Sequence, residues 1–222
     1  MIAEDKIRLE NPWPDIESMK DIERIQLSLD GGGREIVEEL LQDNNIKNLV
    51  EVGAFLCGST RRWLEANPNL TVFCIDSWGS GLRDYLDKLI STFPQWIENQ
   101  VDRDQLRTLI GYYDTYGIME VALNNIKEYR DRLIPIRKNA PEVYEYLKSS
   151  GLEPDVIYID ANKQWPEFIS AHENFPDAII CGDDWTWKDS NGEYPVRDYV
   201  QKLADIRNKK VIAKDATWLI QP

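Results

Sequence analysis

Long apolar runs are missing from this sequence of 222 residues. No stretch approaches the roughly 20 apolar residues that a membrane-spanning helix needs. The first ten residues, MIAEDKIRLE, also lack the apolar core of a signal peptide. We therefore expect a soluble, cytoplasmic protein that does not bind membranes.

Basic side chains are scarce relative to acidic ones. The sequence has 26 Lys and Arg against 39 Asp and Glu, which gives a net charge of -13. A surface of that sign repels phosphate backbones, and the small basic cluster at Arg61 and Arg62 does not offset it. Nucleic acid is therefore not expected as a partner.

Cysteine and histidine are too few and too scattered to suggest a zinc site. The three cysteines, Cys57, Cys74 and Cys181, lie in or beside predicted strands and form no CxxC pair. The single histidine, His172, falls within a predicted helix. We expect buried free thiols and a structural histidine.

The stretch from residue 48 to residue 76 has the pattern strand, turn, helix and strand. Leu49, Val50 and Val52 suit a strand that is buried on both faces, although Glu51 places a charge among them. A turn of small residues follows, and Ser59 and Thr60 stand where a helix would begin. The small residues are Gly53, Ala54, Cys57 and Gly58. Such a turn presents the N–H groups of a helix N-terminus to a ligand.

Two common nucleotide motifs are absent from this turn. An NAD-binding turn reads GxGxxG, whereas here only Gly53 and Gly58 are placed. A Walker loop would end in Gly-Lys-Ser/Thr, which the turn also lacks. Asp76 closes the second strand roughly 20 residues after the turn, where doubly wound folds bind the hydroxyls of a ribose.

Alternating strands and helices predict an α/β fold with a Rossmann-like, seven-stranded, mostly parallel sheet. Only Asp215 and Ala216 separate the last two predicted strands, so we expect the final strand to be antiparallel. Residues 1–45 are predicted to be an N-terminal arm and helices, including one over 15–29, that pack on the core or on a second subunit of a homodimer. Residues 46–222 form the main domain. The triple glycine 31–33 favours a flexible connector over a cover for a ligand.

A polar, aromatic-rich stretch without strand signals interrupts the main domain at about 79–131. It predicts a helical insertion of short helices. That length exceeds what one crossover needs, so the insertion is either a lid over the site or a decorated crossover.

Acidic residues end several predicted strands and should therefore meet at one edge of the sheet. Asp160 follows one buried strand, and Asp183 and Asp184 follow the next. Because these carboxylates would repel one another, a hard cation such as Mg²⁺ between them is one interpretation, and ordinary loop acids are the other. Lys163 lies three residues beyond Asp160 and could act as a base if its pKa were lowered, although composition alone favours a solvated surface lysine.

From about residue 48 to the C-terminus the chain resembles the class I S-adenosylmethionine-dependent methyltransferases. The resemblance is carried by EVGAFLCGST, FCIDSW, PDVIYIDANK and AIICGDDW. It implies a cofactor site in which Asp76 binds the ribose and Glu51 positions the turn and the amino group of the cofactor. The remaining cofactor residues that it implies are Gly53, Ala54 and Ser59 at the methionine end, Ser77 and Trp78 beside the ribose, Asn139 and Ala140 at the adenine, and Asp160.

Within that family the chain is similar to metal-dependent O-methyltransferases of small molecules, including the catechol enzymes. The similarity implies Mg²⁺ held by Asp160, Asp183 and Asp184, with Lys163 as general base and Asp160 as a second catalytic residue. The implied reaction is O-methylation of a small hydroxylated natural product or sugar. A metal-independent methyltransferase and a non-catalytic S-adenosylmethionine-binding partner protein are the alternatives.

Overall fold

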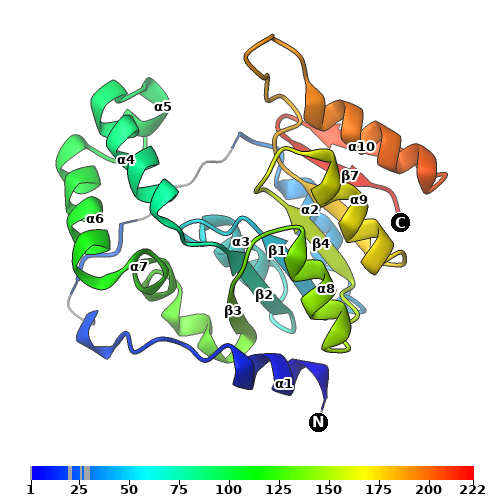
Figure 1. Cartoon of the computed structure of the whole chain (residues 1–222), viewed down its shortest axis with the longest axis horizontal. Helices are drawn as coiled ribbons and strands as arrows, with labels where there is room; N and C mark the ends of the chain where they lie inside the picture. Colours follow the sequence, from blue (N-terminus) through cyan, green and yellow to red (C-terminus); the bar gives the residue numbers. More distant parts are fainter. Residues whose placement is uncertain (1, 20–21, 26, 28–30) are drawn as a thin grey trace.

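A seven-stranded sheet with the order β3-β2-β1-β4-β5-β7-β6 runs through the described part of the chain. The computed structural model describes residues 2–19, 22–25, 27 and 31–222 (Figure 1). Neighbours among the first five strands are parallel, and β7 is antiparallel to both β5 and β6. The strands are β1 (Asn48–Val52), β2 (Thr71–Asp76), β3 (Leu133–Arg137), β4 (Val156–Ile159), β5 (Ile179–Gly182), β6 (Val211–Lys214) and β7 (Thr217–Ile220). The predicted fold class and the reversed last strand are confirmed.

Apolar side chains fill a layer on each face of the sheet because residues along a strand alternate between the faces. Leu49 enters the layer beneath α2 (Glu35–Leu41) and α3 (Gly58–Ala66). Val50 enters the opposite layer. The helices of that second layer are α1 (Ala3–Glu10), α8 (Glu142–Ser149), α9 (Trp165–Asn174) and α10 (Pro195–Ile206). Both faces are covered, as expected for buried parallel strands.

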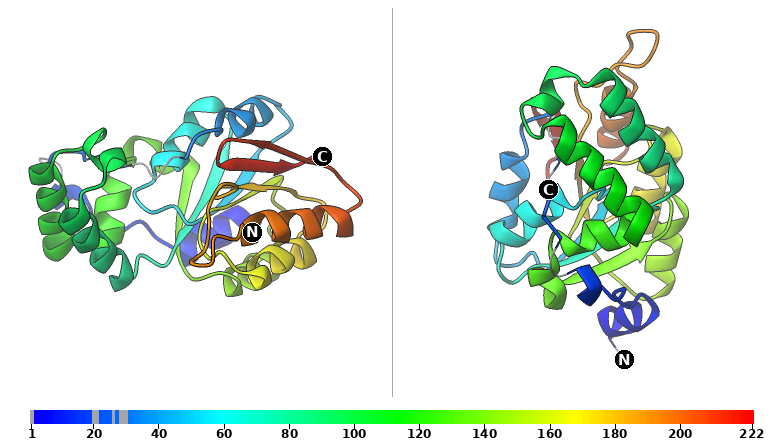
Figure 2. Two further views of the ribbon diagram at one scale, coloured as in Figure 1. Left: turned by 90° about the horizontal axis from the view of Figure 1, so that it is seen from above. Right: turned by 90° about the vertical axis from the view of Figure 1, so that its left-hand side faces the viewer.

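The predicted helical insertion forms a group of helices beyond the β3 side of the sheet (Figure 2). It comprises α4 (Ser80–Thr92), α5 (Gln95–Glu98), α6 (Arg103–Tyr116), α7 (Ile118–Asn124) and a 3-10 helix (Lys127–Arg132). Between residues 79 and 131 the structure contains helices and turns and no strand. None of the helices in the described ranges is long and apolar enough to cross a bilayer.

The N-terminal arm packs on the body of the domain, but its helix lies elsewhere than predicted. The helix predicted over 15–29 was wrong for the residues described there, which contain only a 3-10 turn at Glu17–Met19. Ile16, Met19 and Ile25 are nevertheless buried. Their helix-like spacing reflects contacts of an irregular segment that lies along the apolar layer, and a helix forms instead at α1.

The triple glycine is a tightly packed element, which corrects its interpretation as a flexible connector. Gly33 has φ +87°, and a Cβ there would lie 1.8 Å from the backbone oxygen of Lys214. The hydroxyl of Thr217 donates a hydrogen bond to the carbonyl of Gly32 at 2.8 Å. Only glycine allows this approach to the hairpin of β6 and β7. The contact fixes the start of α2, where Arg34 is the N-cap residue.

Candidate functional site

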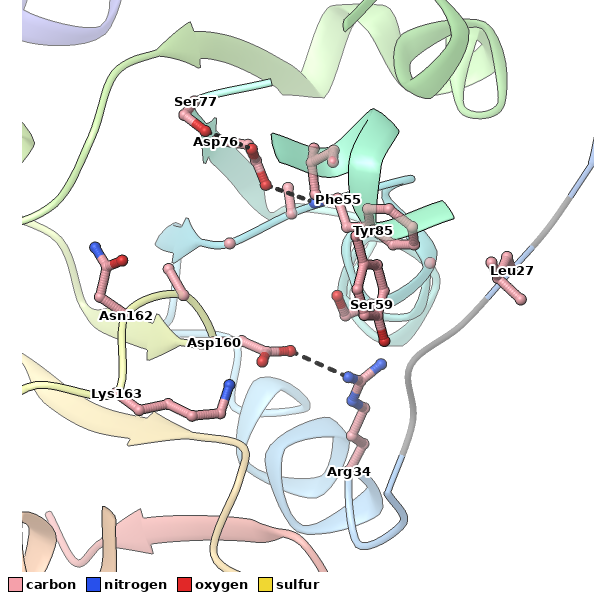
Figure 3. Close-up of a pocket in the computed structure, with 15 residues that line it drawn as sticks. Leu27, Arg34, Phe55, Ser59, Asp76, Ser77, Tyr85, Asp160, Asn162 and Lys163 are labelled. Carbon is pink, nitrogen blue, oxygen red and sulfur yellow. Dashed lines mark hydrogen bonds and ion pairs between the residues drawn. The ribbon is translucent and has the colours of Figure 1, made fainter. Parts of the chain in front are cut away.

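A pocket of about 440 Å³ lies over the carboxyl ends of the central strands (Figure 3). It opens where strand order reverses, since β1 pairs with β2 on one side and β4 on the other. Ligands of open α/β sheets bind at this position. Its lining residues are Leu27, Arg34, Gly53, Ala54, Phe55, Gly58, Ser59, Asp76, Ser77, Leu82, Tyr85, Asp160, Ala161, Asn162 and Lys163.

The glycine turn after β1 forms the floor of this pocket. Gly53 has φ +96°, and a Cβ there would lie 2.0 Å from the backbone oxygen of Asp160. A side chain at this position would therefore push the ends of β1 and β4 apart. Cys57 adopts a left-handed conformation at φ 61° and occupies the position just before the first residue of α3. Gly58 and Ser59 in the first turn of α3 then line the pocket, so the positive end of that helix faces the space.

Asp76 joins the end of β2 to the glycine turn. Its carboxylate accepts hydrogen bonds from the N–H of Phe55 at 2.9 Å and the N–H of Trp78 at 2.7 Å. Burial raises the pKa of Asp76, and these backbone hydrogen bonds oppose that rise. The carboxylate lies in the pocket as an acceptor of fixed orientation, which suits the recognition of hydroxyl groups.

A smaller cavity of about 70 Å³ adjoins the pocket at the end of β3. Asn139 and Ala140 line it, together with Gly53, Asp76 and Ser77, which line the larger pocket as well. The amide of Asn162 donates a hydrogen bond to the carbonyl of Ala140 at 3.2 Å. The two residues predicted at the adenine end therefore lie next to the predicted ribose acid.

Two predicted cofactor residues lie behind the pocket and do not line it. Glu51 is fully buried and accepts hydrogen bonds from the hydroxyl of Thr60 and the indole of Trp63, both in α3. Burial raises the pKa of Glu51, and those hydrogen bonds oppose the rise. Trp78 is also buried, and its indole donates to the carbonyl of Phe55 at 2.9 Å. Alternation along β1 directs Glu51 toward α3, away from the space where a cofactor amino group was predicted, and both residues support the turn from behind.

The acids at the ends of β4 and β5 are held by a guanidinium group. Arg34 lies 2.8 Å from one carboxylate oxygen of Asp183 and 3.3 Å from a carboxylate oxygen of Asp160. The other oxygen of Asp183 accepts the N–H of Asp184 at 2.9 Å. Burial and the charge of Asp183 raise the pKa of Asp160, and the charge of Arg34 opposes this.

The acids at these strand ends do not fit the predicted Mg²⁺ site. In the described ranges no three His, Cys, Asp or Glu residues are arranged to hold a metal ion. Both carboxylate oxygens of Asp183 already accept a hydrogen bond, one of them from Arg34, and Asp160 faces the same guanidinium. The sequence places the acids together correctly but does not show that an arginine joins them.

Lys163 reaches the same region and forms an ion pair with Asp184 at 2.7 Å. Burial of its ammonium acts to lower the pKa of Lys163, but the charge of Asp184 and the hydrogen bond to it outweigh burial and raise the pKa. The predicted lowering was therefore wrong in direction, because Asp184 is closer to the ammonium than sequence spacing could show. In this state Lys163 is a cationic hydrogen-bond donor.

Several residues of the pocket were missed from the sequence. Leu82 and Tyr85 come from α4, so the insertion does cover part of the site. Asn162 adjoins the predicted Lys163 and has a polar side chain, which could have indicated it. Arg34 gave no comparable signal beyond its place after three glycines at a helix start.

Solved structures similar to this chain include O-methyltransferases. An O-methyltransferase from Bacillus cereus in complex with SAH superposes with a TM-score of 0.54 at 14% identity over 98% of this chain and 89% of that one. A Staphylococcus aureus protein assigned as a caffeoyl-CoA O-methyltransferase gives 0.53 at 16% identity, over 98% and 96% of the two chains. A cofactor-bound protein from MTB gives 0.56 at 15% identity, over 98% and 88%. The chain has the Rossmann-like methyltransferase fold.

Sequence comparisons add little to this result. No family model matches the chain. Among curated proteins, subunit 3 of the conserved oligomeric Golgi complex of Schizosaccharomyces pombe is 27% identical over 129 residues, which cover 53% of this chain. The match spans only 17% of that protein's length. The likeness to the solved structures, at 14 to 16% identity, therefore shows the fold and nothing more. The match to the curated protein adds no evidence about the fold.

Proposed function

We propose that the protein is an S-adenosylmethionine-dependent methyltransferase that methylates a hydroxyl group of a small molecule, such as a natural product or sugar. One observation carries the proposal. A single pocket connects the glycine turn and Asp76 to Asp160 and Lys163. The pocket therefore offers a nucleoside-binding end and a charged end within one space, in a fold shared with O-methyltransferases.

The nucleoside end suits S-adenosylmethionine. Asp76 accepts the ribose hydroxyls, and the adenine lies along Asn139 and Ala140 in the adjoining cavity. Gly53, Ala54 and Ser59 receive the methionine end beside the N-terminus of α3, where N–H groups favour a carboxylate. When bound, the cofactor supplies an electrophilic methyl group on a sulfonium.

The charged end holds the acceptor for direct displacement. Asp160 and Lys163 line the pocket, and Figure 3 shows their polar ends directed toward the same space. Asp160 orients the acceptor hydroxyl by accepting its hydrogen bond. As the new C–O bond forms and the C–S bond breaks, the hydroxyl proton passes to Lys163 if Lys163 acts as the base in its neutral form. If the ammonium of Lys163 only orients the acceptor oxygen by donating to it, the proton passes to Asp160. Fixing the oxygen in line with the methyl group is itself a large contribution to such a reaction.

Of the metal-dependent and metal-independent forms, the ion pairs favour the metal-independent one. Arg34 and Lys163 already neutralise charge at the acids that were predicted to bind Mg²⁺. These residues do not fit the ion, so the proposed reaction has no step that depends on it.

The role of Lys163 as general base remains part of the proposal and can be separated from simple orientation. Lys163→Arg keeps the positive charge but removes an amine that can accept a proton once it has been deprotonated. Lys163→Met removes both functions. A base role predicts that both variants lose methyl transfer and that wild-type activity rises with pH, whereas an orienting role predicts that Lys163→Arg keeps most activity.

Calorimetric titration of the wild-type protein with S-adenosylmethionine and S-adenosylhomocysteine tests the cofactor assignment. We expect both to bind with and without EDTA, and absence of binding in both conditions would contradict the proposal. Transfer from labelled S-adenosylmethionine to a panel of phenols, sugars and other hydroxylated molecules then tests turnover. Binding without any methylated product would indicate the non-catalytic partner protein instead.

A further inference from the structure

Arg34 is the most deeply buried cation in this pocket's lining. Its side chain is 3% exposed, and that of Asp183 is 4% exposed. Figure 3 shows the guanidinium directed from the start of α2 toward Asp160. A planar guanidinium can donate to two carboxylates at once, which a lysine ammonium does with less directional control.

Backbone contacts on either side of this cluster fix the positions of the segments that carry the guanidinium and the acids. Gly33 packs against Lys214, and the indole of Trp218 in β7 donates to the backbone carbonyl of Asp183 at 2.7 Å. The hairpin of β6 and β7 therefore contacts both the segment that delivers Arg34 and the strand end that delivers Asp183. Arg34 is thus a built part of the site and not a surface side chain that happens to reach it.

The charges of the cluster are nearly balanced by the chain itself. Asp160 and Asp183 share Arg34, and Asp184 pairs with Lys163. Three carboxylates against two cations leave one negative charge. A divalent ion at this position would have to approach a guanidinium that already occupies the space between the acids, and like charges repel more strongly at a partly buried site than in bulk water.

We propose that Arg34 is the resident cation of the acceptor site and takes the place of a divalent metal between Asp160 and Asp183. Arg34 is a positioning residue in this scheme, because it fixes the carboxylate of Asp160 that faces the acceptor. The statement that this cluster belongs to an acceptor site rests on the proposed function. Whether Arg34 keeps a metal ion out of the cluster can be measured without any methyl transfer.

Mn²⁺ binding, followed by electron paramagnetic resonance and calorimetry, tests this assignment. The wild-type protein should bind Mn²⁺ at the cluster only weakly, whereas Arg34→Gln should bind it there with a Kd at least about 10-fold lower. This tighter binding should disappear when Asp183→Asn is added to Arg34→Gln. The matched control is Arg24→Gln, since Arg24 pairs with the exposed Glu128 and its loss should create no site.

Two results would overturn the assignment. One is stoichiometric Mn²⁺ binding by the wild-type protein that Asp183→Asn abolishes. The other is a folded Arg34→Gln protein that binds no more Mn²⁺ than the wild type does. If Arg34→Gln does not fold, Mn²⁺ binding by the wild type is compared with that by Asp183→Asn. Equally weak binding by the two supports the assignment, and binding that only the wild type shows overturns it. Failure of the wild type to bind S-adenosylmethionine would refute the proposed function and leave the metal result unaffected, so the two failures are distinguishable.

Discussion

Replacing Arg34 by glutamine should destabilise the fold far more than replacing an exposed arginine. The change removes the positive charge between Asp160 and Asp183 while leaving both carboxylates in place. Because the Arg34 and Asp183 side chains are 3% and 4% exposed, water cannot replace the lost interactions. Two like charges would then face each other in a medium of low polarity.

The size of the effect follows from this burial. Removing one partner of a buried ion pair costs about 3 to 5 kcal/mol of unfolding free energy. For a domain of this length, 1 kcal/mol shifts the melting temperature by about 2 to 4 °C. We therefore expect Arg34→Gln to melt about 6 to 20 °C below the wild type.

Urea unfolding followed by circular dichroism measures this free energy, with thermal melting as a second readout. Arg24→Gln is the control, because the Arg24 and Glu128 side chains are 38% and 37% exposed and such pairs contribute about 0 to 1 kcal/mol. If Arg34→Gln lowers the free energy of unfolding by less than about 1 kcal/mol, as the control does, the buried ion pairs of Arg34 with the acids do not stabilise the fold and the reasoning is refuted.

Three other substitutions test separate parts of the site and its surroundings. Asp76→Asn removes a charged acceptor and should weaken S-adenosylmethionine binding about 10- to 100-fold by calorimetry, and an unchanged affinity would contradict the ribose assignment. Gly53→Ala must adopt φ +96° beside the backbone of Asp160, so we expect about 1 to 3 kcal/mol of strain in urea unfolding, whereas Gly111→Ala, with nothing within 4 Å of its Cβ, should show no such loss. Burial raises the pKa of Glu167 from 4.5 to about 8, so its ionisation opposes folding increasingly as pH rises from 4.5 through 8. Glu167→Gln should consequently be more stable than wild type by about 3 to 5 kcal/mol at pH 9 but not at pH 4, and parallel stability curves would contradict this.

Local sequence patterns were sufficient for the architecture. The apolar residues of β1 and β4 and the short connection between β6 and β7 predicted a parallel sheet with a reversed last strand, because burial on both faces demands continuous apolar runs. Asp76 and Asp160 were predicted at one edge because the carboxyl ends of parallel strands meet there. These inferences depend only on contacts between neighbours in the chain and on the regular geometry of strands.

Side-chain direction and long-range pairing could not be obtained in this way. Glu51 looked like a ligand of the pocket, but its place along β1 directs it into α3, where Thr60 and Trp63 donate to it. Lys163 was expected to have a lowered pKa, but the ion pair with Asp184 raises it. Both outcomes depend on contacts between elements, which sequence spacing does not report.

Local patterns in the chain are enough to predict the sheet, the glycine turn and the gathering of acids at the strand ends. The group that neutralises those acids is visible only in the folded protein. Arg34 lies 126 residues from Asp160 and 149 from Asp183 along the chain. It reaches them because glycines 31–33 pack against a hairpin formed by the last strands, and no local pattern encodes a meeting of three segments so far apart.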